Sequence, residues 1–233
     1  MTVLRSTIEL TNRLLAQLKA GRQVSLPPGL DGVRLNLGCG LAVAPGWLNI
    51  DGSLNALVAN MPAAMHGLIY RLTGARQYYS EQEYRRLLGE HKFMHHDLAS
   101  GIPLADGVAD CVFSSHFLEH LFRKDADHLL RECHRVLKPG GVLRISVPDL
   151  EYAVSLYAAG EKEKMLRNYF FVDDDDSYYA RHKYMYDYAM LESQLADIGF
   201  TQITRCQYRQ GRTPDLEVLD NRPEESLFVE AVK

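Results

Sequence analysis

The sequence predicts one α/β domain built around a mainly parallel β-sheet. From Val33 onward, short apolar runs alternate with stretches of helical periodicity, which is the pattern of βαβ units. Hydrophobic residues make up 46% of the 233 residues and charged residues 24%, a composition that excludes a disordered, collagen-like or coiled-coil chain. This length is sufficient for one large core, so residues 1–233 are interpreted as a single domain.

The N-terminal segment, residues 1–30, is predicted to contain a helix. Leu4, Ile8 and Leu14 are among the apolar residues of 4–20 that follow helical spacing, and Gly21 ends the pattern before a Pro-Pro-Gly turn. The core is expected to occupy 31–148 and 188–233. Its first five strands are predicted at 33–37, 47–50, 93–95, 109–114 and 142–147.

The second half of the core is predicted to begin with a helix at 125–137, where Leu129, Cys133 and Val136 share one face. A Lys-Pro-Gly-Gly run at 138–141 then indicates a turn into the fifth strand. The chain is expected to close with a helix at 188–198 and two strands at 201–206 and 226–232.

Two connections are too long for a minimal βαβ arrangement. Residues 54–91 separate the second and third strands, and residues 149–187 follow the fifth. Because loops beyond about 12–15 residues are usually functional or contain helices of their own, both are predicted to be helical lid insertions above the sheet. The acidic run 173–176 and the neighbouring Tyr178 and Tyr179 suggest that the second insertion is the more mobile and polar one.

Charge and cysteine content restrict the possible partners. The chain has 26 Lys and Arg against 30 Asp and Glu, a net charge of -4, which disfavours generic nucleic-acid binding. No apolar run approaches the length of a membrane span, and no export signal is visible in residues 1–21. Four scattered cysteines are typical of reduced thiols, so we expect a cytoplasmic protein without a membrane partner.

The most informative motif is a strand that runs into Gly38 and Gly40, followed by a second strand that ends at Asp51. Glycines let the backbone turn sharply and approach a ligand, and a carboxylate at the neighbouring strand end can accept both hydroxyl hydrogens of a ribose. A nicotinamide dinucleotide fits poorly, because Val43 stands where a small residue is needed and Asp51 follows Gly38 too closely.

Four successive motifs resemble the class I S-adenosylmethionine-dependent methyltransferases, in particular the type 11 small-molecule branch. These are the Leu-Gly-Cys-Gly loop at 37–40, Asp51, the His-Asp-Leu segment at 96–98 with 102–106, and the strand-helix-turn-strand region from 110 to 148. The resemblance implies a Rossmann-like, seven-stranded, mainly parallel sheet with an antiparallel last strand. It also implies S-adenosyl-L-methionine bound by Asn36, Gly38, Cys39, Gly40, Asp51, Asp97, Leu98, Ser114 and Ser115. Asn36 departs from the family pattern, since many relatives have an acid there.

Catalysis is predicted near the end of the fourth strand. His116 lies where open α/β sheets bind ligands, and an imidazole with an ordinary pKa of about 6.5 can remove an acceptor proton near neutrality. Glu119 and His120 share a helical face with His116 and are predicted to act with it. Small-RNA 2'-O-methyltransferases and ubiquinone-pathway O-methyltransferases carry a metal-binding Glu-x-x-Glu-His motif here. That comparison adds His182 as a fourth ligand, but the sequence prediction is a metal-free site.

The proposed partner is a small-molecule methyl acceptor with a reacting oxygen or nitrogen. Tyrosines between 169 and 188 would suit a saccharide, and the segment 214–227 resembles methyltransferases that accompany glycan genes. Two alternatives stay open: a binding scaffold that retains the cofactor site without turnover, and an RNA-end 2'-O-methyltransferase. The sequence makes no prediction of oligomeric state.

Overall fold

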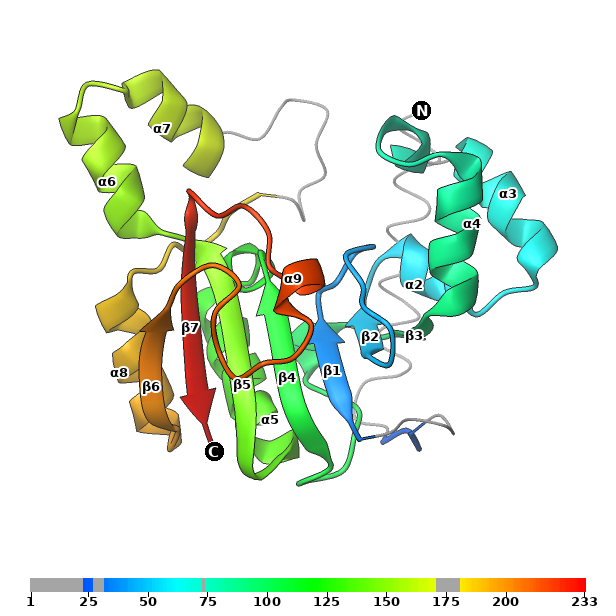
Figure 1. The fold of residues 1–233 in the computed structure, drawn as a ribbon, viewed down its shortest axis with the longest axis horizontal. Helices are drawn as coiled ribbons and strands as arrows, with labels where there is room; N and C mark the ends of the chain where they lie inside the picture. The colour runs from blue at the N-terminus through cyan, green and yellow to red at the C-terminus, as the bar shows by residue number, and fades with distance from the viewer. Residues whose placement is uncertain (1–22, 27–31, 73, 171–180) are drawn as a thin grey trace.

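The computed structural model describes residues 23–26, 32–72, 74–170 and 181–233 (Figure 1). The predicted N-terminal helix and the run from Asp173 to Tyr179 lie outside these residues. The described strands form one seven-stranded sheet, ordered β3-β2-β1-β4-β5-β7-β6. They are β1 Arg34–Leu37, β2 Leu48–Asp51, β3 Lys92–His95, β4 Ala109–Ser115, β5 Leu137–Pro148, β6 Thr201–Cys206 and β7 Ser226–Val232.

The pairing confirms the mainly parallel sheet. Strands β1 to β5 pair in parallel, whereas β7 is antiparallel to both β5 and β6. The chain runs outward from β1 through β2 to β3 and then returns to place β4 beside β1. Since open α/β sheets bind ligands where the strand order reverses, the carboxyl ends of β1 and β4 mark the expected site.

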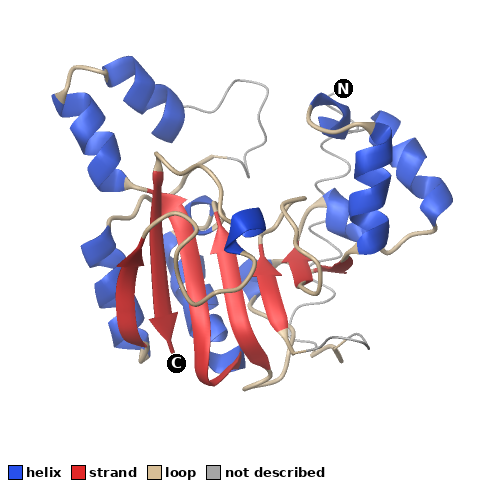
Figure 2. Ribbon diagram, viewed as in Figure 1, coloured by secondary structure: helices blue, strands red, loops and turns tan. Residues whose placement is uncertain are grey.

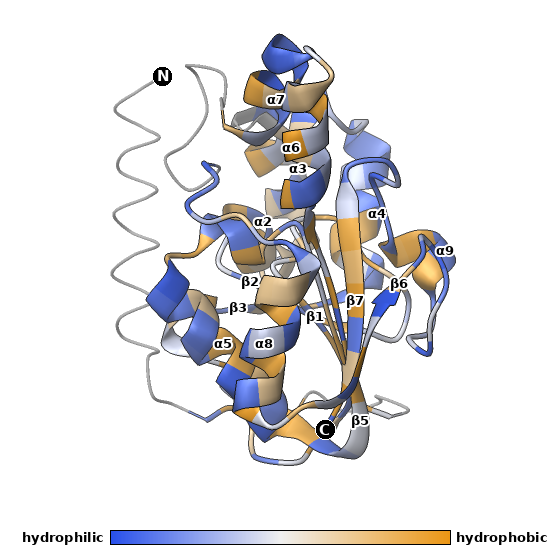
Figure 3. Cartoon of the chain, turned by 90° about the vertical axis from the view of Figure 1, so that its left-hand side faces the viewer, coloured by the Kyte–Doolittle hydropathy of each residue, from blue (hydrophilic) through white to orange (hydrophobic). Residues whose placement is uncertain are grey.

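Helices on both faces enclose the core. Helices α5 (Arg123–Val136) and α8 (Tyr188–Ile198) lie on one side of the sheet, and the short α9 (Leu216–Leu219) lies on the other (Figure 3). Leu35, Val112 and Ile145 of neighbouring strands are almost fully buried in the same apolar cluster as Leu129 and Cys133 of α5. The one-sided apolar face predicted for this helix is therefore confirmed.

The predicted insertions consist of helices that flank the carboxyl edge of the sheet (Figures 1 and 2). The first holds α2 (Leu54–Ala59), α3 (Ala63–Leu72), the 3₁₀ helix η1 (Gly74–Gln77) and α4 (Glu81–Glu90). The second holds α6 (Leu150–Ala158) and α7 (Lys162–Tyr169). Asp149 caps α6 by accepting the Glu151 amide at 2.9 Å and pairs with Arg205 at 2.7 Å, which fixes the second insertion to the sheet.

The start of β5 differs from the prediction. The strand begins at Leu137, so the run 138–141 lies within it rather than before it. The pairing register with β4 shifts at this end, and Gly140 has a φ of +78°. The Gly140 amide also donates to the carbonyl of Lys233 at 3.0 Å. The glycine run therefore bends an already paired strand so that the C-terminal residue can bond to it.

The segment between β6 and β7 is bound to the sheet by a buried arginine. Arg144 of β5 is fully buried, pairs with Asp220 at 2.6 Å and Glu230 at 3.3 Å, and donates to two loop carbonyls. Asp215 in the same segment accepts the Trp47 indole N–H at 2.8 Å. These contacts make the segment a structural part of the domain. No described helix is long and apolar enough to span a bilayer.

Candidate active site

The glycine loop after β1 makes the sharp turn that its sequence predicts. Gly38 and Gly40 have φ values of +65° and +52°, in the left-handed region that favours glycine. A Cβ atom on Gly38 would overlap the Phe117 ring, whereas no described atom lies within 4 Å of the position that a Cβ on Gly40 would take. The first glycine therefore makes room for a protein side chain, and the second leaves open space beside the loop.

Asp51 holds this loop from the end of β2. One carboxylate oxygen accepts the Gly40 amide at 2.8 Å, and the other accepts the Ser53 amide at 2.6 Å. The side chain is 8% exposed. Because a carboxylate oxygen has more than one acceptor lone pair, both oxygens retain capacity for two ribose hydroxyls.

Asn36 and Cys39 belong to the interior of the loop. The Asn36 amide nitrogen donates to the Ala42 carbonyl at 2.8 Å and to Asn49 Oδ1 at 3.0 Å, so both of its N–H groups are used within the protein. Cys39 is buried, and burial raises the pKa of its thiol well above the ordinary value. Cofactor contacts by these two residues remain predictions.

Asp97 and Leu98 lie beyond the end of β3. Asp97 is exposed and caps the 3₁₀ helix η2 (Leu98–Ser100) by accepting the Ala99 amide at 3.1 Å. Its backbone approaches Gly52, which places it near Asp51. The Leu98 side chain is buried in the main apolar cluster. Any contact between Leu98 and a cofactor would therefore involve its backbone.

Three serines near this loop offer buried hydroxyls. Ser53 Oγ follows Asp51, and Ser114 Oγ and Ser115 Oγ lie at the end of β4. None of the three has a hydrogen-bond partner within the described part of the chain. Since buried polar groups normally have partners, these hydroxyls mark the strand ends as a place where a polar ligand fits.

The chain turns sharply where β4 ends. His116 has a φ of +48°, which is rare for a residue other than glycine, and its amide donates to the Ser146 carbonyl at 2.8 Å. The 3₁₀ helix η3 (Leu118–His120) follows at once. This turn places Phe117 over Gly38, and Glu119 and His120 follow it in η3.

His116 contacts protein groups through both ring nitrogens. The Ser226 hydroxyl donates to the Arg222 carbonyl at 2.7 Å, so toward His116 Nε2, at 2.8 Å, it acts as the acceptor. The Nε2 atom therefore carries hydrogen. The other nitrogen, Nδ1, lies 3.4 Å from Glu119 Oε1.

Glu119 is the most deeply buried member of the site. Its side chain is 1% exposed, and neither carboxylate oxygen has a hydrogen-bond partner among the described residues. Burial alone would raise the pKa of this carboxyl, but His116 and His120 outweigh burial and lower the pKa below its ordinary value. Glu119 is therefore an anion at neutral pH.

His120 and His182 turn the same ring nitrogen toward that anion. Nδ1 of His120 donates to the Arg181 carbonyl at 3.2 Å, and Nδ1 of His182 donates to the Tyr169 carbonyl at 2.8 Å. Because a carbonyl oxygen only accepts, both Nδ1 atoms carry hydrogen, and a neutral ring then has a bare lone pair on Nε2. Burial lowers the pKa of His182, so that ring is neutral near pH 7.

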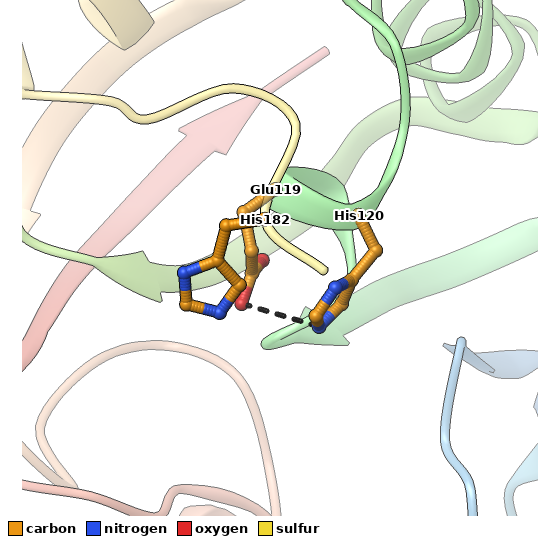
Figure 4. A group of neighbouring side chains, drawn as sticks. All are labelled: Glu119, His120 and His182. Atoms are coloured by element: carbon orange, nitrogen blue, oxygen red, sulfur yellow. Dashed lines mark ion pairs between the residues drawn. The ribbon is translucent and has the colours of Figure 1, made fainter. Parts of the chain in front are cut away.

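Figure 4 shows these side chains converging from η3 and from the last part of the second insertion. Ligand atoms of Glu119, His120 and His182 all lie within 4.8 Å of one another. Backbone bonds fix the two segments together, since Lys183 and Tyr184 both donate to the Glu119 carbonyl. The structure thus brings together three of the four residues considered as ligands from the sequence, and His116 stands outside the group.

Residues 35–145 match the family model described as a methyltransferase domain. Residues 35–145 are a class I methyltransferase domain of type 11.

Relatives and solved structures extend the comparison. The chain is 41% identical over 66 residues to a malonyl-[acyl-carrier protein] O-methyltransferase of Coxiella burnetii, covering 27% of this chain and 23% of that protein. It is 42% identical over 55 residues to a probable S-adenosylmethionine-dependent methyltransferase of Mycolicibacterium smegmatis, covering 24% and 20%. The matches therefore span about a fifth of each relative.

One solved structure resembles the whole chain. It is a S-adenosylmethionine-dependent methyltransferase of Thermotoga maritima, described as a possible histamine N-methyltransferase. The TM-score is 0.51 at 16% identity, with 100% of this chain and 96% of that chain covered. A similarity at this identity supports the shared methyltransferase fold.

The residues of this methyltransferase domain fit S-adenosylmethionine, the methyl donor that the family uses. The open space beside Gly40, the spare acceptor capacity of Asp51 and the buried hydroxyls of Ser53, Ser114 and Ser115 meet at the same strand ends. When bound, this cofactor supplies a methyl group already activated on a sulfonium.

Several contributors to the site have no sequence signal. Phe117 contacts Gly38 although 79 residues separate them, and Ser226 contacts His116 across 110 residues. The Arg181 and Tyr169 groups that orient the two histidines are backbone carbonyls, which any residue could supply. Conversely, Tyr169 and Tyr186, predicted as pocket candidates, are each 1% exposed and pack in the interior.

Proposed function

We propose that this protein transfers a methyl group from S-adenosylmethionine to an oxygen or nitrogen of a small molecule. The main support for the proposal is the position of Asp51. Two backbone amides donate to its carboxylate and hold it beside the glycine loop, with lone pairs left over for a ligand. The acceptor lone pair forms a bond to the methyl carbon while the carbon–sulfur bond breaks, and any acceptor proton must leave. Positioning the two reactants provides much of the rate enhancement.

The acceptor is proposed to bind over η3, beside Phe117. Glu119, His120 and His182 supply the polar groups there, and the helices of the two insertions supply the surrounding walls. We propose that His116 positions Glu119 rather than contacting the acceptor, because both of its nitrogens already face protein groups. A saccharide or glycan precursor remains the preferred acceptor class.

The test is transfer of labelled methyl from S-adenosylmethionine to a panel of acceptors that includes saccharides, phenols, amines and a short RNA. Label in a small hydroxyl or amine compound, lost in Asp51→Ala, supports the proposal. Label in RNA alone would show that the acceptor is RNA and not a small molecule. Tight cofactor binding without transfer to a metabolite extract or to RNA would indicate a binding scaffold instead.

A further inference from the structure

Three side chains that can act as metal ligands, Glu119, His120 and His182, face one another beyond the end of β4. The Nδ1–H groups of His120 and His182 both point away, to backbone carbonyls, so their Nε2 atoms face the Glu119 carboxylate. His120 Nε2 lies 3.9 Å from Glu119 Oε1. When neither Nε2 atom carries hydrogen, three electron-pair donors meet at this point, and a cation among them is stabilising.

The same hydrogen bonds have the form that metal sites use to orient their ligands. A histidine that binds a metal through one nitrogen usually donates the other N–H to a carbonyl or a carboxylate, which fixes the ring and the lone pair. Both rings here satisfy this condition, and they come from segments 62 residues apart that backbone bonds hold together. The rings are therefore oriented by the fold itself.

We propose that Glu119, His120 and His182 bind one divalent transition-metal ion. The fully buried Glu119 carboxylate supplies negative charge, and a bound ion compensates that charge directly. Two imidazole nitrogens and one carboxylate suit zinc and its neighbours, whereas magnesium and calcium prefer oxygen ligands. Three protein ligands leave at least one coordination position for an acceptor atom.

This ion selects the class of acceptor, an inference that rests on the proposed function. A coordinated hydroxyl loses its proton to solvent more readily, and the resulting oxygen keeps lone pairs with which to attack a methyl carbon. A coordinated amine has no further lone pair and cannot attack. We therefore infer that the acceptor is a hydroxyl compound and that the product is a methyl ether.

The direct test is calorimetric titration of Zn²⁺ into the full chain after chelator treatment and dialysis, with neither cofactor nor acceptor present. One ion per chain is expected, bound at least about tenfold more weakly by His182→Gln. Mg²⁺ should bind far more weakly than Zn²⁺. The exposed His128 of α5 provides the matched control, because His128→Ala removes a histidine elsewhere and should leave Zn²⁺ binding unchanged.

Circular dichroism shows whether His182→Gln has kept its fold, and Co²⁺ absorption in the parent protein gives a second readout that needs no variant. Equal Zn²⁺ affinity in the parent and His182→Gln, absence of Zn²⁺ binding, or absence of a ligand-field spectrum with Co²⁺ would overturn the site. Preference for Mg²⁺ would also overturn it, since that ion does not favour nitrogen ligands.

Different experimental results would contradict the metal site and the proposed function. Stoichiometric Zn²⁺ binding together with no methyl transfer to any acceptor supports the site and contradicts the function. Methyl transfer that continues unchanged in chelator, and in His182→Gln, supports the function and contradicts the role of the ion in it. Transfer to amines alone would contradict the hydroxyl selectivity.

Discussion

Two buried carboxylates near the carboxyl ends of the strands, Asp51 on the cofactor side and Glu119 on the acceptor side, differ in the groups that surround them. Around Asp51, each carboxylate oxygen receives a backbone N–H, so charge and hydrogen bonds are balanced before any ligand arrives. Around Glu119, the carboxylate faces the Nε2 atoms of two imidazoles and has no hydrogen-bond partner among the described residues. The comparison indicates that backbone hydrogen bonds hold the carboxylate of the first region, whereas histidine side chains balance the carboxylate of the second and leave ligand atoms available for an ion.

Glu119→Gln is the strongest test of this difference between the two carboxylates, because it keeps the side-chain shape and removes the charge. Turnover should fall at least about 100-fold, because the buried carboxylate that holds the ion is lost. The free energy of unfolding, measured by urea denaturation in chelator, should fall by about 1 kcal/mol, because the lowered pKa of Glu119 means that the folded state favours its charged form. A destabilised variant with normal turnover would show that Glu119 is only a structural residue.

Asp51→Ala should lower both stability and cofactor affinity. It removes two backbone hydrogen bonds to a charged acceptor as well as the ribose contacts. Affinity for S-adenosylmethionine should fall about ten- to a hundredfold, and the free energy of unfolding should fall by about 1.5–3 kcal/mol. Calorimetry and denaturation provide the two measurements. Unchanged cofactor affinity would contradict the prediction that Asp51 binds the ribose hydroxyls.

The glycine pair offers a matched test of the contact between the two regions. Both Gly38→Ala and Gly40→Ala place a side chain at positive φ, which costs about 1 kcal/mol, but only the first also displaces the Phe117 ring. Gly38→Ala should therefore lower the melting temperature more, and Phe117→Ala should restore part of that difference. Equal melting temperatures for the two glycine variants would contradict the described contact.

The smallest expected effect is that of Asp97→Ala. Its carboxylate is exposed and makes one capping bond, so stability should fall by about 1 kcal/mol. Cofactor affinity should fall less than in Asp51→Ala, and a titration of both variants with S-adenosylmethionine decides the order. A larger loss of affinity in Asp97→Ala than in Asp51→Ala would show that the main polar contact with the cofactor lies after β3 rather than at the end of β2.

Local patterns predicted most of the fold. The helix at 188–198 and the strands at 201–206 and 226–232 have the predicted bounds, because apolar periodicity and Gly199 are local signals. The predicted start of β5 was wrong, because the glycines at 140 and 141 bond to Lys233, which is distant in sequence. The predicted mobility of 173–179 lies outside the described residues.

The candidate site was only partly accessible from sequence. Spacing brought together Glu119 and His120, but no periodicity relates them to His182, whose ring is fixed by a backbone carbonyl of α7. Nor does sequence show which histidine nitrogens carry hydrogen. The reversal from a metal-free prediction to a proposed metal site comes from these hydrogen positions, which depend on contacts between distant segments.

The Phe117 ring has a thermodynamic consequence. It packs on the cofactor loop at Gly38, while the next residues of its own turn carry Glu119 and His120. A ligand that shifts the loop must shift the turn, so the two binding equilibria share one element. Linkage then requires reciprocity: the factor by which S-adenosylmethionine changes the affinity for the ion equals the factor by which the ion changes the affinity for S-adenosylmethionine.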